Sequence, residues 1–208
     1  MTELERLLAG PVVEAASDLL GRRLESRVDG RLVAVVIVEV EAYGGLDDPA
    51  SHAHRGPTAR NRSMFGPPGT LYVYRSYGVH WCMNVVTGPQ GQASAVLLRG
   101  GDAVAGVDTM VERRGRSDNL ARGPGRLAQA LGLSGDLDGS SVFDGPLSIS
   151  DVPHPRPTWT ASPRIGISRA TDRPWRFVLS GFESAIGRDD AGQSGGEKNG
   201  APQRNLTR

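Results

Sequence analysis

Glu39 and Glu41 stand two positions apart near the end of a long apolar stretch, and Tyr43 continues the same spacing. Alternate side chains of an extended chain point to the same side, so these three residues would share one face of a strand. A carboxylate at the edge of an apolar sheet loses hydration, which raises its pKa towards the range of a general base at neutral pH. The spacing favours neither glutamate over the other, and a structural ion pair with an arginine is an equal alternative for either.

His52 and His54 form a His-x-His pair, a pattern that could hold a transition metal. Few carboxylates stand near them, so we expect no metal and favour loop imidazoles that form hydrogen bonds or stack. A metal hydrolase that uses His52 and His54 stays an alternative hypothesis. The single cysteine, Cys82, excludes an internal disulfide and a zinc site built on cysteines, and its apolar neighbours indicate a buried packing residue.

Three of the four tyrosines, Tyr72, Tyr74 and Tyr77, lie within six positions of one another. Tyr72 and Tyr74 would share one strand face, whereas Tyr77 has the opposite parity and precedes Gly78, so it can project from a turn. Aromatic side chains beside arginine on a strand and its turn suit base stacking and insertion into a duplex. For Tyr72 the ordinary strand preference of tyrosine is the favoured explanation.

The net charge of +1 hides two basic stretches, and all of the 24 basic side chains except Lys198 are arginine. Acidic residues are missing between positions 49 and 101, where five arginines fall, and positions 152–180 hold five arginines against Asp172 alone. Arginine makes planar, bidentate contacts to phosphate, so this pattern favours an anionic polymer such as nucleic acid. A GC-rich genome would explain arginine in place of lysine, but not the missing acids.

The stretch Gly123-Pro124-Gly125-Arg126 precedes an apolar helical pattern. It lacks the Gly-Lys-Ser/Thr ending of a nucleotide phosphate loop. The amides of a helix N-terminus together with Arg126 could still hold a phosphate.

The elements that would position these residues are mostly strands. Helices are expected at Pro11–Leu20, Ala103–Arg114 and around Leu127–Leu131. Strands are expected at Arg23–Arg27, Leu32–Ala42, Thr70–Tyr77, Trp81–Val86, Ala93–Arg99, Val142–Ser150, Arg164–Ser168 and Arg176–Leu179. Asp29-Gly30 predicts a two-residue hairpin turn, and Gly45–Pro68 a long irregular segment. Because helices do not alternate with strands, we expect an α+β fold with a mainly antiparallel, curved β-sheet, flanking helices and a protruding β-hairpin.

The length of 208 residues suits one domain, which we place at residues 1–187. Residues 188–208 are polar and rich in glycine, and we expect a disordered tail there. Neither a signal peptide nor an apolar run long enough to cross a membrane is present, so a cytoplasmic, nucleoid-associated protein is expected.

Taken together and in order, several stretches resemble the alkyladenine (3-methyladenine) DNA glycosylase family in its bacterial form. The resemblance covers roughly residues 10–180 and rests on Val38–Tyr43, His52, Arg60–Phe65, Pro68–Tyr74, Tyr77-Gly78, Cys82–Asn84, Val96–Arg99 and Gly123-Pro124. Each stretch is weak alone, whereas the ordered set is specific.

The resemblance implies a base excision repair enzyme that flips a damaged purine out of double-stranded DNA and hydrolyses its N-glycosidic bond. It implies Glu41 as the base that activates water, with Arg99 beside it. The flipped base would lie between Tyr43 on one face and His52 with Tyr74 on the other. Glu39 becomes a supporting residue.

The resemblance further implies that Tyr77 enters the minor groove as a wedge and that Asn84 obstructs the amino group of guanine. Arg60, Arg62 and Arg126 would contact DNA phosphates. It implies a monofunctional enzyme without cofactor or metal, acting as a monomer without an obligate protein partner or membrane. A non-catalytic nucleic-acid binder built on the same sheet stays the alternative.

The sequence departs from the family pattern at three places. A long N-terminal extension is missing, His80 and Trp81 replace other apolar or aromatic residues, and Arg126 replaces an expected lysine. Arginine preserves a phosphate contact at that position.

Overall fold

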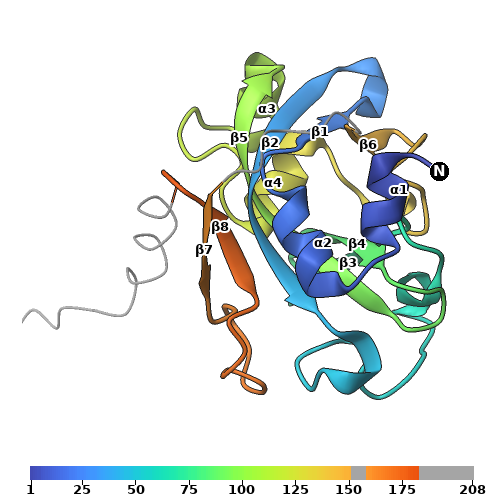
Figure 1. The fold of residues 1–208 in the computed structure, drawn as a ribbon. Helices are drawn as coiled ribbons and strands as arrows, with labels where there is room; N and C mark the ends of the chain where they lie inside the picture. Colours follow the sequence, from blue (N-terminus) through green and yellow to red (C-terminus); the bar gives the residue numbers. More distant parts are fainter. Residues whose placement is uncertain (151–157, 183–208) are drawn as a thin grey trace, which may run out of the picture.

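The computed structural model describes residues 1–150 and 158–182. Within them the chain forms one antiparallel sheet with helices on both sides, which confirms the predicted α+β class (Figure 1). The expected tail at 188–208 lies outside the described residues. No helix among the described residues is long and apolar enough to cross a membrane.

Six strands follow one another across the sheet in the order β3-β4-β5-β2-β1-β6, and β8 pairs with both β2 and β7. The bounds are β1 Arg23–Ser26, β2 Val33–Tyr43, β3 Leu71–Ser76, β4 His80–Thr87, β5 Ser94–Ala105, β6 Leu147–Ile149, β7 Trp159–Ser162 and β8 Arg176–Leu179. The long strand β2 is central: β5 pairs along one edge, and β1 and then β8 pair along the other. Nearly all of its residues are buried, as its continuous apolar sequence predicts.

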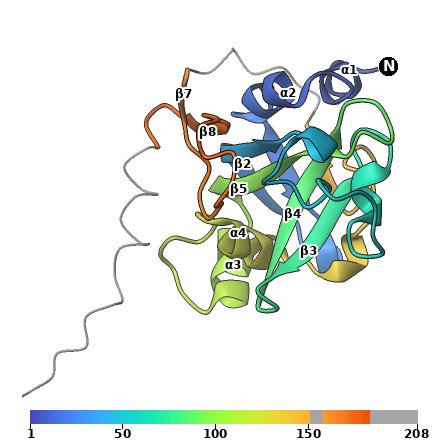
Figure 2. The same ribbon diagram turned by 90° about the horizontal axis from the view of Figure 1, so that it is seen from below.

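Four helices cover the sheet from opposite sides (Figure 2). The pair α1 Glu3–Leu8 and α2 Val12–Leu19 lies on one side, and the pair α3 Val107–Arg114 and α4 Pro124–Leu131 lies on the other. The turn between β3 and β4 lies at the end of the molecule where α3 is found. The sequence analysis omitted α1, although its first turn has a capping box in which Thr2 and Glu5 bond each other's backbone amides.

Two predictions near β5 were wrong. The helix expected from Ala103 begins only at Val107, because β5 continues to Ala105 and pairs there with Ala34 of β2. Gly101 makes this possible, since a Cβ atom at that position would lie 2.6 Å from the side chain of Val35. Within the range 103–114 that was predicted as a helix, Met110 is buried, whereas Val104 and Val107 are exposed.

Three predictions about turns and short strands were also wrong. Asp29-Gly30 has the positive φ angles of a tight turn but belongs to a wider connection, because β1 leaves β2 at Ser26 and the Arg27 amide bonds the carbonyl of Pro146 instead. Only Leu147–Ile149 of the expected strand 142–150 is extended, since the chain turns at Gly145. Arg164–Ser168 is a loop, and the strand β7 precedes it.

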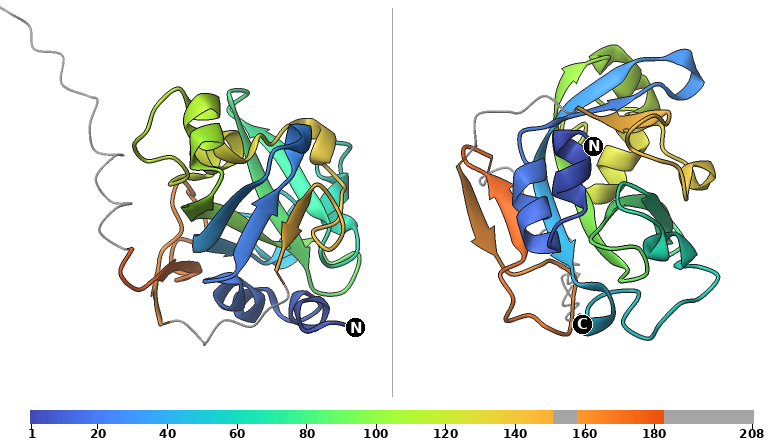
Figure 3. Two further views of the ribbon diagram at one scale, coloured as in Figure 1. Left: turned by 90° about the horizontal axis from the view of Figure 1, so that it is seen from above. Right: turned by 45° about the vertical axis from the view of Figure 1, so that its right-hand side comes forward.

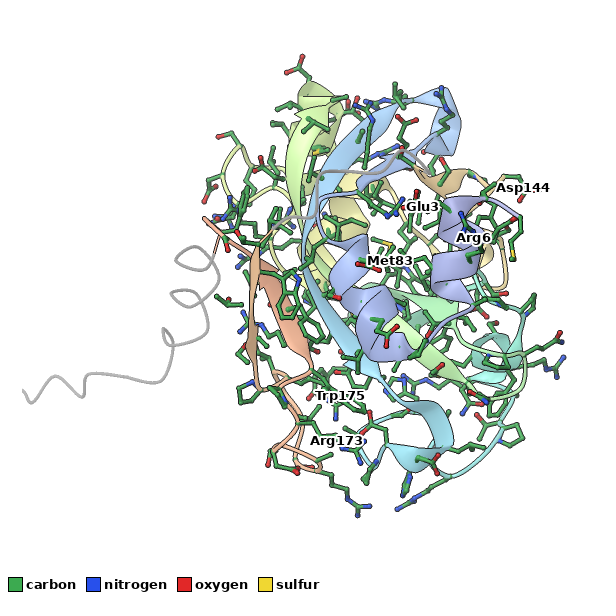
Figure 4. The ribbon with its side chains drawn as sticks, in the orientation of Figure 1. Glu3, Arg6, Met83, Asp144, Arg173 and Trp175 are labelled. Atoms are coloured by element: carbon green, nitrogen blue, oxygen red, sulfur yellow. The ribbon has the colours of Figure 1, made fainter. Side chains whose placement is uncertain are left out.

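The long irregular segment 45–68 holds two short 3-10 helices and packs on its own small core, formed by Ala53, Met64, Tyr72, Val86, Ala93 and Ala95. This segment and the loop between β7 and β8 lie side by side at the end of β2 (Figure 3). In that loop Arg173 lies over the ring of Trp175, with 4.7 Å from Cζ to the ring centroid (Figure 4). The two loops therefore meet where Glu41 and Tyr43 end the central strand.

Candidate active site

A cavity of about 570 Å³ opens where the two loops meet the sheet. Its wall contains seven of the residues selected from the sequence, namely Tyr43, His52, Arg60, Tyr74, Tyr77, Asn84 and Arg99. These come from β2, β3, β4, β5, the turn between β3 and β4, and the segment 45–68, so residues far apart in the sequence are brought together. A cavity of this size holds a ligand as large as a nucleobase with its sugar.

Glu41 lies directly behind the cavity wall, with a fully buried side chain. Its Oε1 accepts a hydrogen bond of 2.8 Å from the backbone amide of Ile165, and its Oε2 accepts one of 2.8 Å from the Tyr43 hydroxyl. Arg99 Nε lies 3.5 Å from Oε1. All three partners line the cavity, so a small displacement of one of them would expose the carboxylate to a water there.

Burial raises the pKa of Glu41 above its ordinary value, although Arg99, the Ile165 amide and the Tyr43 hydroxyl act to lower it. The neighbouring Glu39 raises it a little further. A carboxylate with a raised pKa is a better proton acceptor, so this environment suits a general base.

Glu39 lies on the same side of β2, as its spacing predicts, and is also fully buried. Its Oε1 accepts hydrogen bonds from Arg99 Nε at 3.1 Å and from Arg176 Nε at 2.5 Å. The ion pair considered as an alternative for either glutamate is therefore strongest at Glu39. This difference separates the two carboxylates, which the spacing alone could not do.

Three aromatic rings stand together on one side of the cavity. Tyr72 and Tyr74 are stacked with ring centroids 5.4 Å apart, and His52 meets Tyr74 edge-on at 4.6 Å. His52 Nδ1 and the Tyr72 hydroxyl are hydrogen-bonded at 3.0 Å. Burial, aided by the charge of Arg60, lowers the pKa of His52, so the imidazole is neutral at pH 7.

Tyr43 stands at the same cavity with Arg164 over its ring, 4.6 Å from Cζ to the centroid. Asn84 is nearly buried and donates from Nδ2 to the carbonyl of Tyr72 at 3.1 Å, which fixes its amide in the wall. Cys82 is buried, as predicted, and also contributes to the wall.

Tyr77 is 97% exposed at the turn between β3 and β4. Its φ angle of 49° is in the left-handed region, which costs a residue other than glycine about 1–2 kcal/mol. Val79, two positions on, is 63% exposed. This turn exposes Tyr77 and Val79 beside a cavity, with Tyr77 in a disfavoured backbone conformation. Such a combination is typical of a contact surface.

The predicted phosphate contacts are distributed around the cavity. Arg60 lines it and lies 6.0 Å from the ring centroid of Tyr74. Arg62 is exposed on the 3-10 helix at 62–65 and does not line the cavity. Arg126 is on the first turn of α4, where its Nη1 bonds the carbonyl of Arg122, and Pro124 of the same turn reaches the cavity wall.

The loop 164–168 belongs to the site but was predicted from the sequence as a strand, so its role was missed. Ile165 and Ile167 line the cavity, and Arg164 fastens the loop to the segment 45–68. The fully buried Arg164 guanidinium donates two hydrogen bonds to Asp48, of 2.5 and 2.9 Å, and one to the carbonyl of Ala42. Burial acts to raise the pKa of Asp48, but these bonds and two backbone amides hold it below its usual range. An arginine between Pro163 and Ile165 gave no signal of this role in the sequence.

The two histidines of the His-x-His pair serve different partners. His54 Nδ1 lies 2.9 Å from the carbonyl of Leu46, whereas His52 faces Tyr72. Among residues 1–150 and 158–182, no three His, Cys, Asp or Glu side chains are grouped so that they could hold a metal ion.

Comparison with known sequences matches most of this chain to one protein family. The sequence model of methylpurine-DNA glycosylase (MPG) matches residues 6–183. A protein of Frankia casuarinae is 51% identical over 191 residues, which are 85% of this chain and 88% of the relative. Relatives from Rhodopseudomonas palustris (50% over 181 residues, 85% and 86%) and Methanoculleus marisnigri (49% over 175 residues, 81% and 90%) are similar to the same extent. All three carry the name "Putative 3-methyladenine DNA glycosylase".

Proposed function

Because this chain belongs to the methylpurine-DNA glycosylase family and is therefore a DNA glycosylase of base excision repair, we propose that Glu41 is the general base of its reaction. The family sets aside the non-catalytic nucleic-acid binder. One observation carries the proposal: Glu41 is the buried carboxylate with a raised pKa whose hydrogen-bond partners all line the cavity.

The substrate is double-stranded DNA that contains an alkylated or deaminated purine of the 3-methyladenine type. The damaged base leaves the duplex, and Tyr77 fills the gap. In the cavity the base stacks between Tyr43 and the pair His52 with Tyr74. A purine methylated at ring nitrogen N3 or N7 carries a positive charge that the faces of these rings attract. Asn84 disfavours normal guanine, whose exocyclic amino group would meet its fixed amide.

Glu41 removes a proton from a water held beside Arg99. The water oxygen bonds to the sugar C1′ while the electrons of the N-glycosidic bond leave with the base. The products are the free base and an abasic site. The only lysine, Lys198, lies outside the stretches that match the family, so we propose a monofunctional enzyme without a Schiff-base step.

Arg60, Arg62 and Arg126 hold DNA phosphates on either side of the cavity. Arg60 stands at the cavity itself, and Arg126 shares the first turn of α4 with Pro124. The enzyme acts as a monomer at the nucleoid.

The test is Glu41→Gln on duplex DNA treated with dimethyl sulfate. Gln preserves shape but accepts no proton, so release of methylated purines should fall by about 10²-fold or more while binding to the damaged duplex persists. Glu25→Gln, on β1 of the same sheet and paired with Arg23, is the matched control. Release by Glu41→Gln at the wild-type rate would disprove the assignment.

A chelator arm of the same assay tests the metal hydrolase that uses His52 and His54. Full release in EDTA is expected. Loss in EDTA with recovery on adding a divalent metal would revive that alternative.

A further inference from the structure

Two carboxylates and two guanidiniums alternate in a row at the end of the central strand: Arg176, Glu39, Arg99 and Glu41. The side chains of Glu39 and Glu41 are fully buried, and those of Arg99 and Arg176 are 10% and 16% exposed. The row draws on three paired strands, β8, β2 and β5. Arg176 and Glu41 are opposite each other in the register, yet the Arg176 side chain bonds Glu39.

We infer that the Glu39–Arg176 pair positions Arg99 for the reaction. It holds Arg99 closer to Glu39 than to Glu41, so that Glu41 keeps its strength as a base. The inference rests on the function proposed above and assigns a role to two residues that do not touch the cavity.

The distances support a competition for Arg99. Its Nε lies 3.1 Å from Glu39 and 3.5 Å from Glu41, so the shared guanidinium favours Glu39. A guanidinium bound closely to Glu41 would stabilise the ionised form and weaken the base. Without Glu39, Arg99 would lose the hydrogen bond that holds its Nε on this side of the row.

Arg176 supplies a second positive charge beside Glu39, which lies close to the carboxylate of Glu41. Both guanidiniums bond the same oxygen, Oε1, while Oε2 of Glu39 is buried without a hydrogen-bond partner in the part of the chain that the structure describes. Leaving a buried carboxylate oxygen bare costs free energy, so this arrangement is not the one that stability alone would favour. Gly100 lies beside this carboxylate, since a Cβ there would lie 3.5 Å from Oε2, at an ordinary contact distance.

The charged and titratable groups around Glu41 come from every element packed on it. They are Glu39 and Tyr43 on β2, Arg99 on β5, Arg176 on β8, Arg164 in the loop before β8 and Tyr74 on β3. Only Arg99 among the cations bonds or pairs with Glu41 itself, which makes its position decisive.

Opposite substitutions in the pair should move the pH profile in opposite directions. In Glu39→Gln, Arg99 moves to Glu41 and the pKa of Glu41 falls. The acid limb of the pH profile of the single-turnover release rate therefore shifts to lower pH, and the plateau rate drops severalfold. In Arg176→Gln, Glu39 keeps Arg99 as its one guanidinium partner and draws it further from Glu41, so the pKa of Glu41 rises and the limb shifts to higher pH. The charge-balanced double variant should lie between the two.

The experiment uses the full chain and dimethyl sulfate-treated duplex, with Glu25→Gln and Glu41→Gln measured alongside. Thermal denaturation reports the folding of each variant. If Arg176→Gln does not fold, Arg176→Lys takes its place; it keeps the charge and should retain the wild-type pH profile. The inference would be overturned if the acid limbs of Glu39→Gln and Arg176→Gln were unchanged or moved in the same direction. If Glu41→Gln is inactive in that case, the proposed function still stands. A fully active Glu41→Gln would remove the proposed function and this inference with it.

Discussion

The hydroxyl of Tyr43 donates a 2.8 Å hydrogen bond to Oε2 of Glu41, two positions earlier on the same strand. The ring that is proposed to stack on the flipped base is therefore joined directly to the carboxylate that is proposed to activate water. Burial and the charge of Glu41 raise the pKa of Tyr43 far above its ordinary value, so the phenol stays a neutral donor. A flipped base that stacks on the Tyr43 ring would therefore also alter the hydrogen bond between Tyr43 and Glu41.

Tyr43→Phe separates these two roles. It retains the stacking face but removes a hydrogen bond that lowers the pKa of Glu41, so that pKa rises. We expect release from methylated duplex to be weakened most at acidic pH and least at alkaline pH, measured under single turnover. Tyr43→Ala should lose release at every pH, because the stack is lost too. A Tyr43→Phe profile equal to that of the wild type would show that the hydrogen bond has no part in the reaction.

Tyr77→Ala tests the wedge. The exposed ring makes few contacts in the free protein, so its removal should leave the melting temperature unchanged. Release from duplex DNA should fall more than release from single strands, where no gap has to be filled. Phe143, another exposed aromatic residue, gives a control in Phe143→Ala. An equal loss on both substrates would show that Tyr77 is not a wedge.

Asp48→Asn should be the most damaging of the conservative changes to stability. It removes the counter-charge of the buried Arg164, and breaking a buried ion pair costs about 3–5 kcal/mol of unfolding free energy. Denaturant titration measures it. The matched control is Asp118→Asn, which breaks an exposed pair with Arg116 and should leave the midpoint unchanged. Equal midpoints for Asp48→Asn and the wild type would contradict the stabilising role of the Arg164–Asp48 pair.

Glu41→Gln should make the folded protein more stable at neutral pH. Burial raises the pKa of Glu41, so between the unfolded and folded values the native state binds a proton that the unfolded chain has released. The stability due to this proton is full below the unfolded pKa and is lost as pH rises through the folded pKa. Gln imitates the protonated form and avoids the loss. The difference in melting temperature between Glu41→Gln and the wild type should therefore grow as the pH rises above about 4, the ordinary pKa of a glutamate. A difference that is constant or shrinks would contradict the raised pKa.

Much of the fold follows from the sequence because its signals are local. The continuous apolar run ending at Tyr43 is typical of a strand covered on both faces, and β2 is such a strand. The same strand parity put Glu39 and Glu41 on one side. The wrong predictions fall where a distant segment decides: β5 extends to Ala105 because β2 offers a partner, and the expected strand at 164–168 is a loop because Arg164 binds Asp48.

By itself the sequence determined the family, the fold class and the chemical types gathered at the site, since these depend on residue order and on the period of the strands. The family resemblance already singled out Glu41, but only the tertiary structure decided how the surroundings of the two glutamates differ. Arg176, 137 positions from Glu39, occupies one carboxylate, while the Ile165 amide and the Tyr43 hydroxyl bond the other beside the cavity. Charge, burial and hydrogen bonding set a carboxylate's strength as a base, and all three come here from segments that meet only when the chain folds.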